Sequence, residues 1–441
     1  MNPQGQDIQS EPACPSRLEK ISTSHSVAVI NLGCARNTVD SQIILGGLRQ
    51  KGFMIGDPNG AHTVIVNTCA FIDEAKKESI DTILDLIELK KKGTIKKIII
   101  AGCMGERYGA ALTKELKEID AVCGVLSLEK EKNLTQVALT PLHYAYVKIC
   151  ESCFHRCSFC IIPKIKGPFA SRTMPSVLQE IQVLDQKGIQ EINMIGQDIT
   201  SYGLDLYGKK CLDELLKKIC SVTQHIRWIR LLYLHPLHIT DELIRLIACE
   251  AKICSYVDIP LQHINDRILK RMNRGFAKRQ TLALIKKIRD RIPGVTLRTT
   301  LIVGFPGETQ DEFKELVEFV EQTQFDRLGV FMYSREEGTL AYDFPDQIPD
   351  RIKEERFNIL MSKQRKISEG IQKKYGGKMI DVLIDDRDKE SNNTYLGRSA
   401  HDAPDVDGCV YVRSSRELHP GDLLRVQIND TLEYDLVGEA R

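Results

Sequence analysis

The chain contains no apolar stretch that approaches the roughly eighteen residues a membrane-spanning helix needs. Its first residues are polar and do not resemble a signal peptide. We therefore expect a protein of the cytoplasm with no membrane partner.

Two nucleotide-binding motifs are missing as well. No G-x-G-x-x-G follows the first strand-like segment, which argues against a dinucleotide-binding site. The segment Gly304–Glu308 lacks the lysine of a phosphate-binding loop. We interpret it as a turn into a helix that begins near Gln310.

Cysteine, in contrast, is plentiful. The 441 residues include 14 cysteines, and 42% of the residues are hydrophobic, which is ordinary for a globular protein of two or three domains. Because the cytosol keeps thiols reduced, a chain without an export signal is not expected to use them in a disulfide framework. The cysteines that fall into patterns are therefore expected to bind metal or to take part in catalysis.

The most informative pattern is three cysteines in one short segment, Cys153-x3-Cys157-x2-Cys160. Thiolates favour iron–sulfur clusters, and a cubane cluster has four irons, so three cysteines leave one iron open to a substrate. A structural zinc site is the alternative, with His155 as its fourth ligand. Cys150 is another candidate fourth ligand, although it ends a predicted strand. We interpret His155 instead as a solvated or partner-facing loop residue.

A second pattern lies upstream, where three runs rich in Val and Ile each end in a cysteine. Helical patterns from Thr38 to Lys51 and from Ile72 to Lys92 separate the runs, so the order is βαβαβ and a parallel sheet is expected. Since ligands gather at the carboxyl ends of such strands, the three cysteines should meet at one edge. Glycines before two of them allow tight turns beside a bulky cluster. These residues are Gly33, Cys34, Cys69, Gly102 and Cys103.

Three segments around these cysteines, LGCARNTVDS, NTCAFIDEAKKESI and AGCMGERYG, resemble the methylthiotransferase family of radical S-adenosylmethionine (SAM) enzymes. The resemblance extends from about residue 26 to the end of the chain. It implies two [4Fe-4S] clusters, one of which binds SAM. The auxiliary cluster would be held by Cys34, Cys69 and Cys103, and the SAM-binding cluster by Cys153, Cys157 and Cys160.

Two further positions bear on this resemblance. Phe159 matches an aromatic position that the family carries before the third cysteine of the SAM-binding loop. Ser152 stands where members usually have glycine. The serine costs backbone freedom but removes no ligand.

The middle of the chain, from about Tyr144 to Tyr375, is predicted to alternate strands and helices. Strand-like runs lie at 192–196, 229–234, 256–261, 296–303 and 327–333. With the strand before Cys150 they make six, which fits the partial (β/α)6 barrel of radical SAM enzymes. Barrel active sites collect at the carboxyl ends of the strands. Polar residues near those ends are Gln197, Asp198, His235, Gln262, His263 and Arg298, of which we expect Gln197, Gln262 and Arg298 to contact SAM together with Phe159.

After Lys374 the chain changes to short alternating strands broken by Gly, Asn, Asp and Pro, which predicts a small antiparallel barrel. It resembles the TRAM domain of the family. The fold class is thus α/β, with a small β-barrel at the carboxyl end. We expect a disordered tail over 1–25, an N-terminal methylthiotransferase domain over 26–140, a radical SAM domain over 141–373 and a TRAM domain over 374–441.

The charge of the last module suggests its partner. Residues 375–441 contain 8 Lys and Arg against 14 Asp and Glu, a net charge of −6, whereas the whole chain is +1. RNA-binding surfaces are normally basic, so this module suits a basic protein better than a nucleic acid. The segments 397–412 and HRCSFCIIPK also resemble the protein-modifying branch of the family.

That branch implies methylthiolation of the β-carbon of an aspartate in ribosomal protein S12 of the small subunit. The reaction would use two SAM molecules, the two clusters, a reductant and a sulfur donor, with no nucleic-acid substrate. The branch that modifies adenosine in transfer RNA is one alternative. A non-catalytic iron–sulfur or ribosome-binding protein is the other, and it predicts that Cys34, Cys69 and Cys103 are dispensable.

Overall fold

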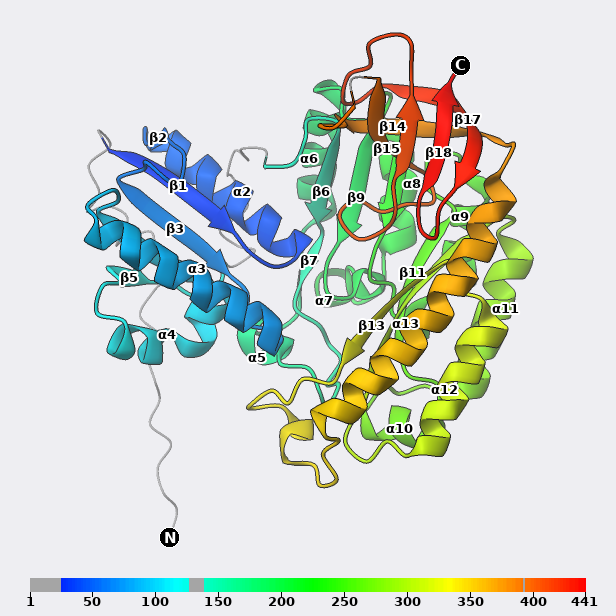
Figure 1. The fold of residues 1–441 in the computed structure, drawn as a ribbon, viewed down its shortest axis with the longest axis horizontal. Helices are drawn as coiled ribbons and strands as arrows, with labels where there is room; N and C mark the ends of the chain where they lie inside the picture. Colours follow the sequence, from blue (N-terminus) through cyan, green and yellow to red (C-terminus); the bar gives the residue numbers. More distant parts are fainter. Residues whose placement is uncertain (1–24, 127–138, 392) are drawn as a thin grey trace. The chain divides into compact units, whose positions relative to one another are not determined.

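The computed structural model describes residues 25–126, 139–391 and 393–441, and the tail predicted to be disordered, residues 1–25, lies almost wholly outside them. The chain divides into two compact units, Met1–Leu139 and Thr140–Arg441 (Figure 1). Among the described residues, no helix has both the length and the apolar composition to cross a membrane.

The first unit is a parallel sheet of five strands in the order β2-β1-β3-β4-β5. Its three long strands are the Val- and Ile-rich runs, and β3 and β4 are buried along nearly their whole length, as is typical of parallel strands. A helix follows each long strand, which confirms the predicted βαβαβ order. The elements are β1 (Ser26–Asn31), α2 (Ala35–Gln50), β2 (Met54–Ile55), β3 (Thr63–Thr68), α3 (Asp73–Lys91), β4 (Lys97–Gly102), α4 (Cys103–Glu115) and β5 (Ala121–Val122).

The second unit begins with six parallel strands in two sheets, β6-β9-β10 and β11-β12-β13. A bridge between Ile229 and Ile253 joins the sheets where β10 meets β11. The partial (β/α)6 barrel is therefore confirmed, and each predicted strand lies within a few residues of the observed one. The strands are β6 (Tyr144–Lys148), β9 (Glu191–Ile195), β10 (Trp228–Leu231), β11 (Tyr256–Gln262), β12 (Thr296–Val303) and β13 (Arg327–Met332), with a small pair, β7 (Cys150–Glu151) and β8 (Ala170–Ser171).

Amphipathic helices cover this barrel. In α8, for example, Leu212, Leu215, Leu216 and Ile219 recur at helical spacing and are all buried. Helix α12 begins at Gln310, as predicted, and is capped by Thr309. The helices are α5 (Ile162–Lys166), α6 (Met174–Gln186), α7 (Leu204–Tyr207), α8 (Leu212–Val222), α9 (Asp241–Cys249), α10 (Asp266–Arg271), α11 (Lys278–Arg291), α12 (Gln310–Thr323) and α13 (Asp350–Gln372), with short 3₁₀ turns at Ile199–Ser201, Pro236–His238, Leu340–Asp343 and Lys373–Tyr375.

The last five strands close a small barrel in the order β14-β15-β16-β18-β17. The prediction of an antiparallel barrel holds for four of its five pairings, but β16 and β18 are parallel. An odd number of strands cannot alternate in direction around a closed ring, so one parallel pair is unavoidable. The strands are β14 (Met379–Arg387), β15 (Thr394–Ser399), β16 (Val410–Arg413), β17 (Leu423–Thr431) and β18 (Leu436–Ala440).

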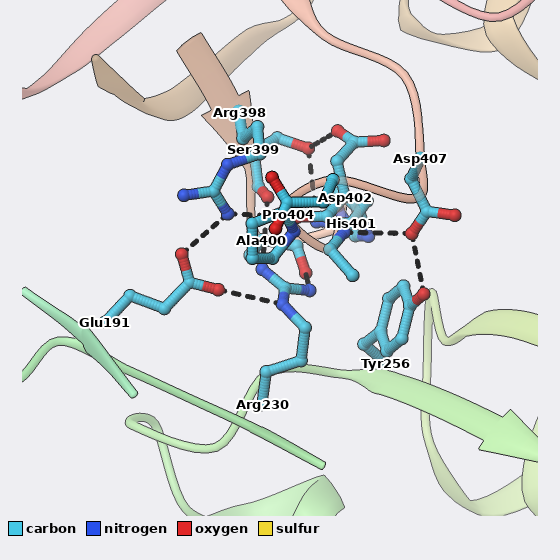
Figure 2. A network of polar contacts seen from close by, with 12 residues as sticks. Glu191, Arg230, Tyr256, Arg398, Ser399, Ala400, His401, Asp402, Pro404 and Asp407 are labelled. Carbon is cyan, nitrogen blue, oxygen red and sulfur yellow. Dashed lines mark hydrogen bonds and ion pairs between the residues drawn. The ribbon is translucent and has the colours of Figure 1, made fainter. Parts of the chain in front are cut away.

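The small barrel is attached to the amino ends of the (β/α)6 strands by buried ion pairs (Figure 2). Glu191, the first residue of β9, accepts from Arg230 Nε at 2.9 Å and from Arg398 Nη1 of β15 at 2.6 Å. Tyr256, the first residue of β11, donates its hydroxyl to Asp407 at 2.6 Å. Because buried charges are stable only when paired, these contacts hold the two parts in one arrangement. The carboxyl ends of the (β/α)6 strands lie at the other end of that barrel, away from the small barrel.

Candidate functional site

Three cysteines follow three adjacent strands of the first unit. Cys34 directly precedes α2 after β1, Cys69 directly follows β3, and Cys103 is the first residue of α4 after β4. Cys69 and Cys103 are buried and Cys34 is partly exposed. Burial raises the pKa of the Cys69 thiol, and the nearby Cys34 raises it further. The structure thus places the three thiols along one edge of the sheet.

Hydrogen bonds between the loops hold this edge together. Asn37 Nδ2, in α2, donates to Thr68 O at 3.0 Å, and Asn67 Nδ2, in β3, donates to Asn37 O at 2.9 Å. Thr68 Oγ1 donates to Ala101 O at 2.6 Å and accepts from Met104 N at 3.2 Å. The start of α2 and the ends of β3 and β4 are therefore tied to one another.

Both glycines identified in the sequence are required by the backbone. Gly33 and Gly102 have φ values of 88° and 86°, in the left-handed region. A Cβ on Gly33 would lie 2.7 Å from Cys69 Cβ, so this glycine allows the loop of Cys34 to approach Cys69. The close approach fits a ligand set contributed by separate loops.

The second cysteine group lies in the loop between β7 and α5. Cys153, Cys157 and Cys160 are each partly exposed, and Cys160 N donates to Cys157 O at 3.1 Å in a tight turn. Burial raises the pKa of the Cys153 and Cys160 thiols to about 12. The loop is packed on a residue that the sequence did not single out, Arg274, whose Nη1 donates to Cys157 Sγ at 3.3 Å.

His155 is not the solvated residue that we expected. Its ring stacks on His235 with 3.6 Å between the ring centroids, and its Nε2 lies 3.1 Å from Asp198 Oδ2. Asp198 also accepts from His238 Nδ1 at 3.3 Å. Although burial raises the pKa of Asp198, the bonds from both histidines hold it well below its usual range. The interpretation failed because His235 and His238 come from a turn far along the chain.

The ring stacking of these histidines argues against a metal ion shared by all three. His155, His235 and His238 have ring nitrogens within 4.8 Å of one another. Yet the rings of His155 and His235 are within 14° of parallel, so their in-plane lone pairs run side by side and do not converge on one ion. Burial lowers the pKa of His235 to about 2, so its ring is neutral.

Cys150, the other candidate ligand, lies in the hydrophobic core of the barrel and is fully buried. A Cβ on Gly196 would lie 2.4 Å from its Sγ, which shows how tightly the thiol is packed. Burial raises its pKa well above that of an ordinary thiol. It therefore serves as a small core residue and not as a fourth ligand.

Two predicted SAM-contacting residues lie at carboxyl ends of barrel strands. Gln197 follows β9 and donates from Nε2 to Glu151 Oε1 at 2.8 Å. Gln262, the last residue of β11, has a φ of 74°. Within the described part of the chain, the side-chain oxygens of both glutamines are buried without a hydrogen-bond partner. Unsatisfied buried acceptors suit a bound polar ligand.

A charged cluster supports Gln197 from below. Lys148 Nζ lies 2.8 Å from Glu151 Oε2, and Lys166 Nζ lies 3.5 Å from Glu151 Oε1. Burial raises the pKa of Glu151, but the two ammonium groups more than offset it and the pKa falls to about 2. Phe159 packs beside an apolar cluster that includes Phe305 and Tyr333. Gln197 and Phe159 are thus held by neighbours that restrict their movement.

The structure contradicts the predicted position of Arg298. It is the third residue of β12, near the amino end of the strand, and does not lie past a carboxyl end. Its guanidinium is paired with Asp258 at 3.0 Å and with Asp407 of the small barrel at 3.4 Å. Arg298 therefore belongs to the contact between the two barrels and is not retained as a SAM-contacting residue.

Comparison with known proteins places three family models on this chain. The radical SAM superfamily matches residues 147–320, the TRAM domain matches residues 377–440, and a family described as uncharacterized protein family UPF0004 matches residues 26–124. The radical SAM match covers most of the (β/α)6 barrel, the TRAM match covers the small barrel, and the UPF0004 match covers the sheet of the first unit.

Curated relatives match nearly the whole chain. A protein of Desulforamulus reducens named ribosomal protein uS12 methylthiotransferase RimO is 44% identical over 440 residues, covering 94% of this chain and 99% of the relative. Proteins of the same name from Clostridioides difficile and Caldanaerobacter subterraneus are 44% and 45% identical, each over 94% of this chain and over 98% and 99% of their own lengths.

A solved structure shares the fold at low identity. It is the radical S-adenosylmethionine methyltransferase TsrM from Kitasatospora setae with cobalamin and a [4Fe-4S] cluster bound, at a TM-score of 0.52 and 15% identity, over 80% of this chain and 78% of that one. This likeness concerns the fold alone.

Proposed function

Since the chain belongs to the RimO family of radical SAM methylthiotransferases, we propose that it methylthiolates the β-carbon of an aspartate in ribosomal protein uS12. The observation that carries this proposal is the match of 42–45% identity to relatives of that name over almost the entire chain. The protein would act in the cytoplasm with a reductant and a sulfur donor.

The chain offers two separate ligand sets for the cofactors. Cys34, Cys69 and Cys103 would hold the auxiliary [4Fe-4S] cluster. The three cysteines of the loop between β7 and α5 would hold the SAM-binding cluster. Both sets consist of three thiols, which leaves an iron of each cubane without a protein ligand. When bound, the clusters and SAM supply the radical, the sulfur atom and the methyl group. The cysteines of that loop are Cys153, Cys157 and Cys160.

The protein's own groups would bind and orient SAM. The unpaired oxygens of Gln197 and Gln262 are acceptors for the donors of the ligand, and Phe159, packed on the cluster of Phe305 and Tyr333, offers an apolar surface. Gln197 is fixed by Glu151, whose charge is in turn held by Lys148 and Lys166. This support restricts the orientations available to the Gln197 amide.

The acidic module gives weaker support for a basic partner than its composition suggests. Four of its aspartates, together with Arg398, contact the (β/α)6 barrel or residues at its amino end. The other 10 acidic and 7 basic residues leave a net charge of −3. The proposal that the substrate is a protein is therefore supported mainly by the family match. The four aspartates are Asp385, Asp402, Asp405 and Asp407.

Mass spectrometry of ribosomal protein uS12 and of transfer RNA tests this proposal. Both would be isolated from cells that lack their own methylthiotransferases, with and without this gene. We expect uS12 heavier by one methylthio group and unchanged transfer RNA, and loss of the modification in Cys69→Ala. Modified transfer RNA with unmodified uS12 would assign the chain to the other branch. Full activity of Cys69→Ala would contradict the role of the auxiliary site.

A further inference from the structure

Arg274 is a buried cation beside the cysteine loop. Its side chain is 5% exposed, its Nη1 donates to Cys157 Sγ at 3.3 Å, and its Nη2 donates to Pro260 O at 2.5 Å. Its Nε has no hydrogen-bond partner among the described residues. One edge of the guanidinium stacks near the ring of Phe276, with 5.3 Å from Cζ to the ring centroid.

The charge of Arg274 is not balanced by a carboxylate. Within residues 25–126, 139–391 and 393–441, no Asp or Glu oxygen lies within ion-pair distance of it, although the buried Arg230 pairs with one carboxylate and the buried Arg398 with two. A buried charge without a counter-ion is strongly destabilising. The geometry therefore requires an anion on the side where Cys157 lies.

The turn that carries Arg274 is built to hold the loop. Helix α10 ends in a Schellman motif, in which Arg274 N donates to Leu269 O and Asn273 N donates to Lys270 O, each at 3.0 Å. Asn273 adopts a φ of 58°, which asparagine tolerates. The motif directs Asn273 Nδ2 to Arg156 O at 2.7 Å, inside the cysteine loop.

A second pair of hydrogen bonds joins the same two segments. Ser158 N donates to Met272 O at 3.0 Å, and Ser158 Oγ donates to Arg271 O at 2.8 Å. The loop between Cys157 and Cys160 is therefore fastened to the helix end that presents the guanidinium. The distance from Arg274 to Cys157 is set by backbone contacts and not by one flexible side chain.

We propose that Arg274 is the counter-ion of the iron–sulfur cluster held by Cys153, Cys157 and Cys160, and that it raises the reduction potential of that cluster. This inference rests on the proposed function, which assigns the cluster to those cysteines. A cation that donates to a ligand sulfur stabilises the more negative, reduced form of a cluster. Arg274 is thus a positioning residue, which acts through the cluster and would make the reduction of that cluster easier.

The test uses full-length protein with Cys34, Cys69 and Cys103 replaced by Ala, so that one cluster remains to be observed. After anaerobic reconstitution, iron and sulfide content are measured, and the potential is determined by a redox titration followed by electron paramagnetic resonance. The spectral change on adding SAM identifies the cluster. We expect Arg274→Gln to shift the potential to a more negative value and to lower the iron content.

Arg271→Gln is the matched control, because Arg271 lies on the same helix end but stacks on Phe344 instead, at 5.2 Å. Its potential should equal that of the parent. If Arg274→Gln does not fold, Arg274→Lys replaces it. Lysine keeps the charge but loses the forked contact to Cys157 and Pro260, so we expect a smaller negative shift of the reduction potential. A potential and iron content equal to the parent in the folded variant would overturn the inference.

The outcomes also separate this inference from the proposed function. If Cys157→Ala binds as much iron as the parent, the cluster is not at this loop and the proposed function itself fails. If Cys157→Ala loses the cluster and Arg274→Gln leaves the potential unchanged, only the role of Arg274 is wrong.

Discussion

Ser152 shows how one residue adapts to a position designed for glycine. Its φ of 64° lies in the left-handed region, which costs a non-glycine residue about 1–2 kcal/mol. Its hydroxyl donates to Gly167 O at 2.6 Å, a bond worth about 1 kcal/mol that glycine could not make. The departure from the family pattern is therefore partly compensated in the same residue.

This balance predicts a small effect of one substitution at Ser152 and a large effect of another. Ser152→Gly should change the free energy of unfolding by less than about 1 kcal/mol, because strain and hydrogen bond are lost together. Ser152→Val should destabilise by about 2 kcal/mol or more, since a β-branched residue disfavours positive φ and leaves Gly167 O without its donor. Thermal unfolding of the anaerobic protein measures both. Equal stability of the Val variant and the parent would contradict the assigned strain.

At the scale of elements, the amino ends of β9, β10 and β11 are joined to β15 and the segment after it by an ion pair and by hydrogen bonds. Glu191 serves two arginines from different elements, Arg230 and Arg398, and all three side chains are almost fully buried. Arg230 also donates to Ala400 O at 2.8 Å. One carboxylate therefore links a strand of the large barrel to a strand of the small one.

Removal of that carboxylate should be costly. In Glu191→Gln the two guanidinium groups stay buried without their shared counter-ion, and we expect a loss of about 3 kcal/mol or more in the free energy of unfolding. Glu242→Gln is the matched control, because Glu242 makes its ion pairs with Arg245 and Lys217 on the exposed surface, where such pairs contribute at most about 1 kcal/mol. Similar denaturation midpoints for the two variants would show that the buried network is not stabilising.

At the scale of the whole molecule, attachment of the small barrel should depend on pH through His401. Its Nδ1 lies 2.8 Å from Thr296 Oγ1 at the start of β12, and burial lowers its pKa below the ordinary value of 6.5. The unfolded chain therefore binds a proton below pH 6.5 that the folded protein does not. Stability contributed by neutral His401 is present above pH 6.5 and is lost as the pH falls, by up to about 1.4 kcal/mol per pH unit.

Comparison of His401→Gln with the parent isolates this effect. The parent should lose stability more steeply than the variant between pH 7.5 and pH 5.5, whatever other groups contribute to both. Urea denaturation at the two pH values measures the difference. Parallel losses in parent and variant would mean that His401 protonates equally well in the folded protein.

Local patterns in the sequence predicted most of the architecture. Each Val- and Ile-rich run became a strand of the parallel sheet, α12 begins at Gln310, and Gly33 and Gly102 make the tight turns expected of them with positive φ. These features depend on residues within a few positions of one another, which is the range over which propensity, periodicity and turn chemistry act. The loop cysteines could be singled out from their spacing, and the upstream cysteines from the strand-like runs that precede them.

What only the tertiary structure decided involves partners far apart in the chain. Arg274 is 117 residues from Cys157, and Arg298 is turned toward Asp407 of the small barrel by a contact that no local pattern records. His155 was misread because the histidine that stacks on it follows another strand. The sequence by itself determined which cysteines are candidates to bind the clusters, because their positions after strand-like runs and within one short loop can be seen without the fold. Folding decided which charged groups surround those cysteines. Burial removes water from a charge, so the charge is stable only beside groups that the fold brings to it from elsewhere in the chain.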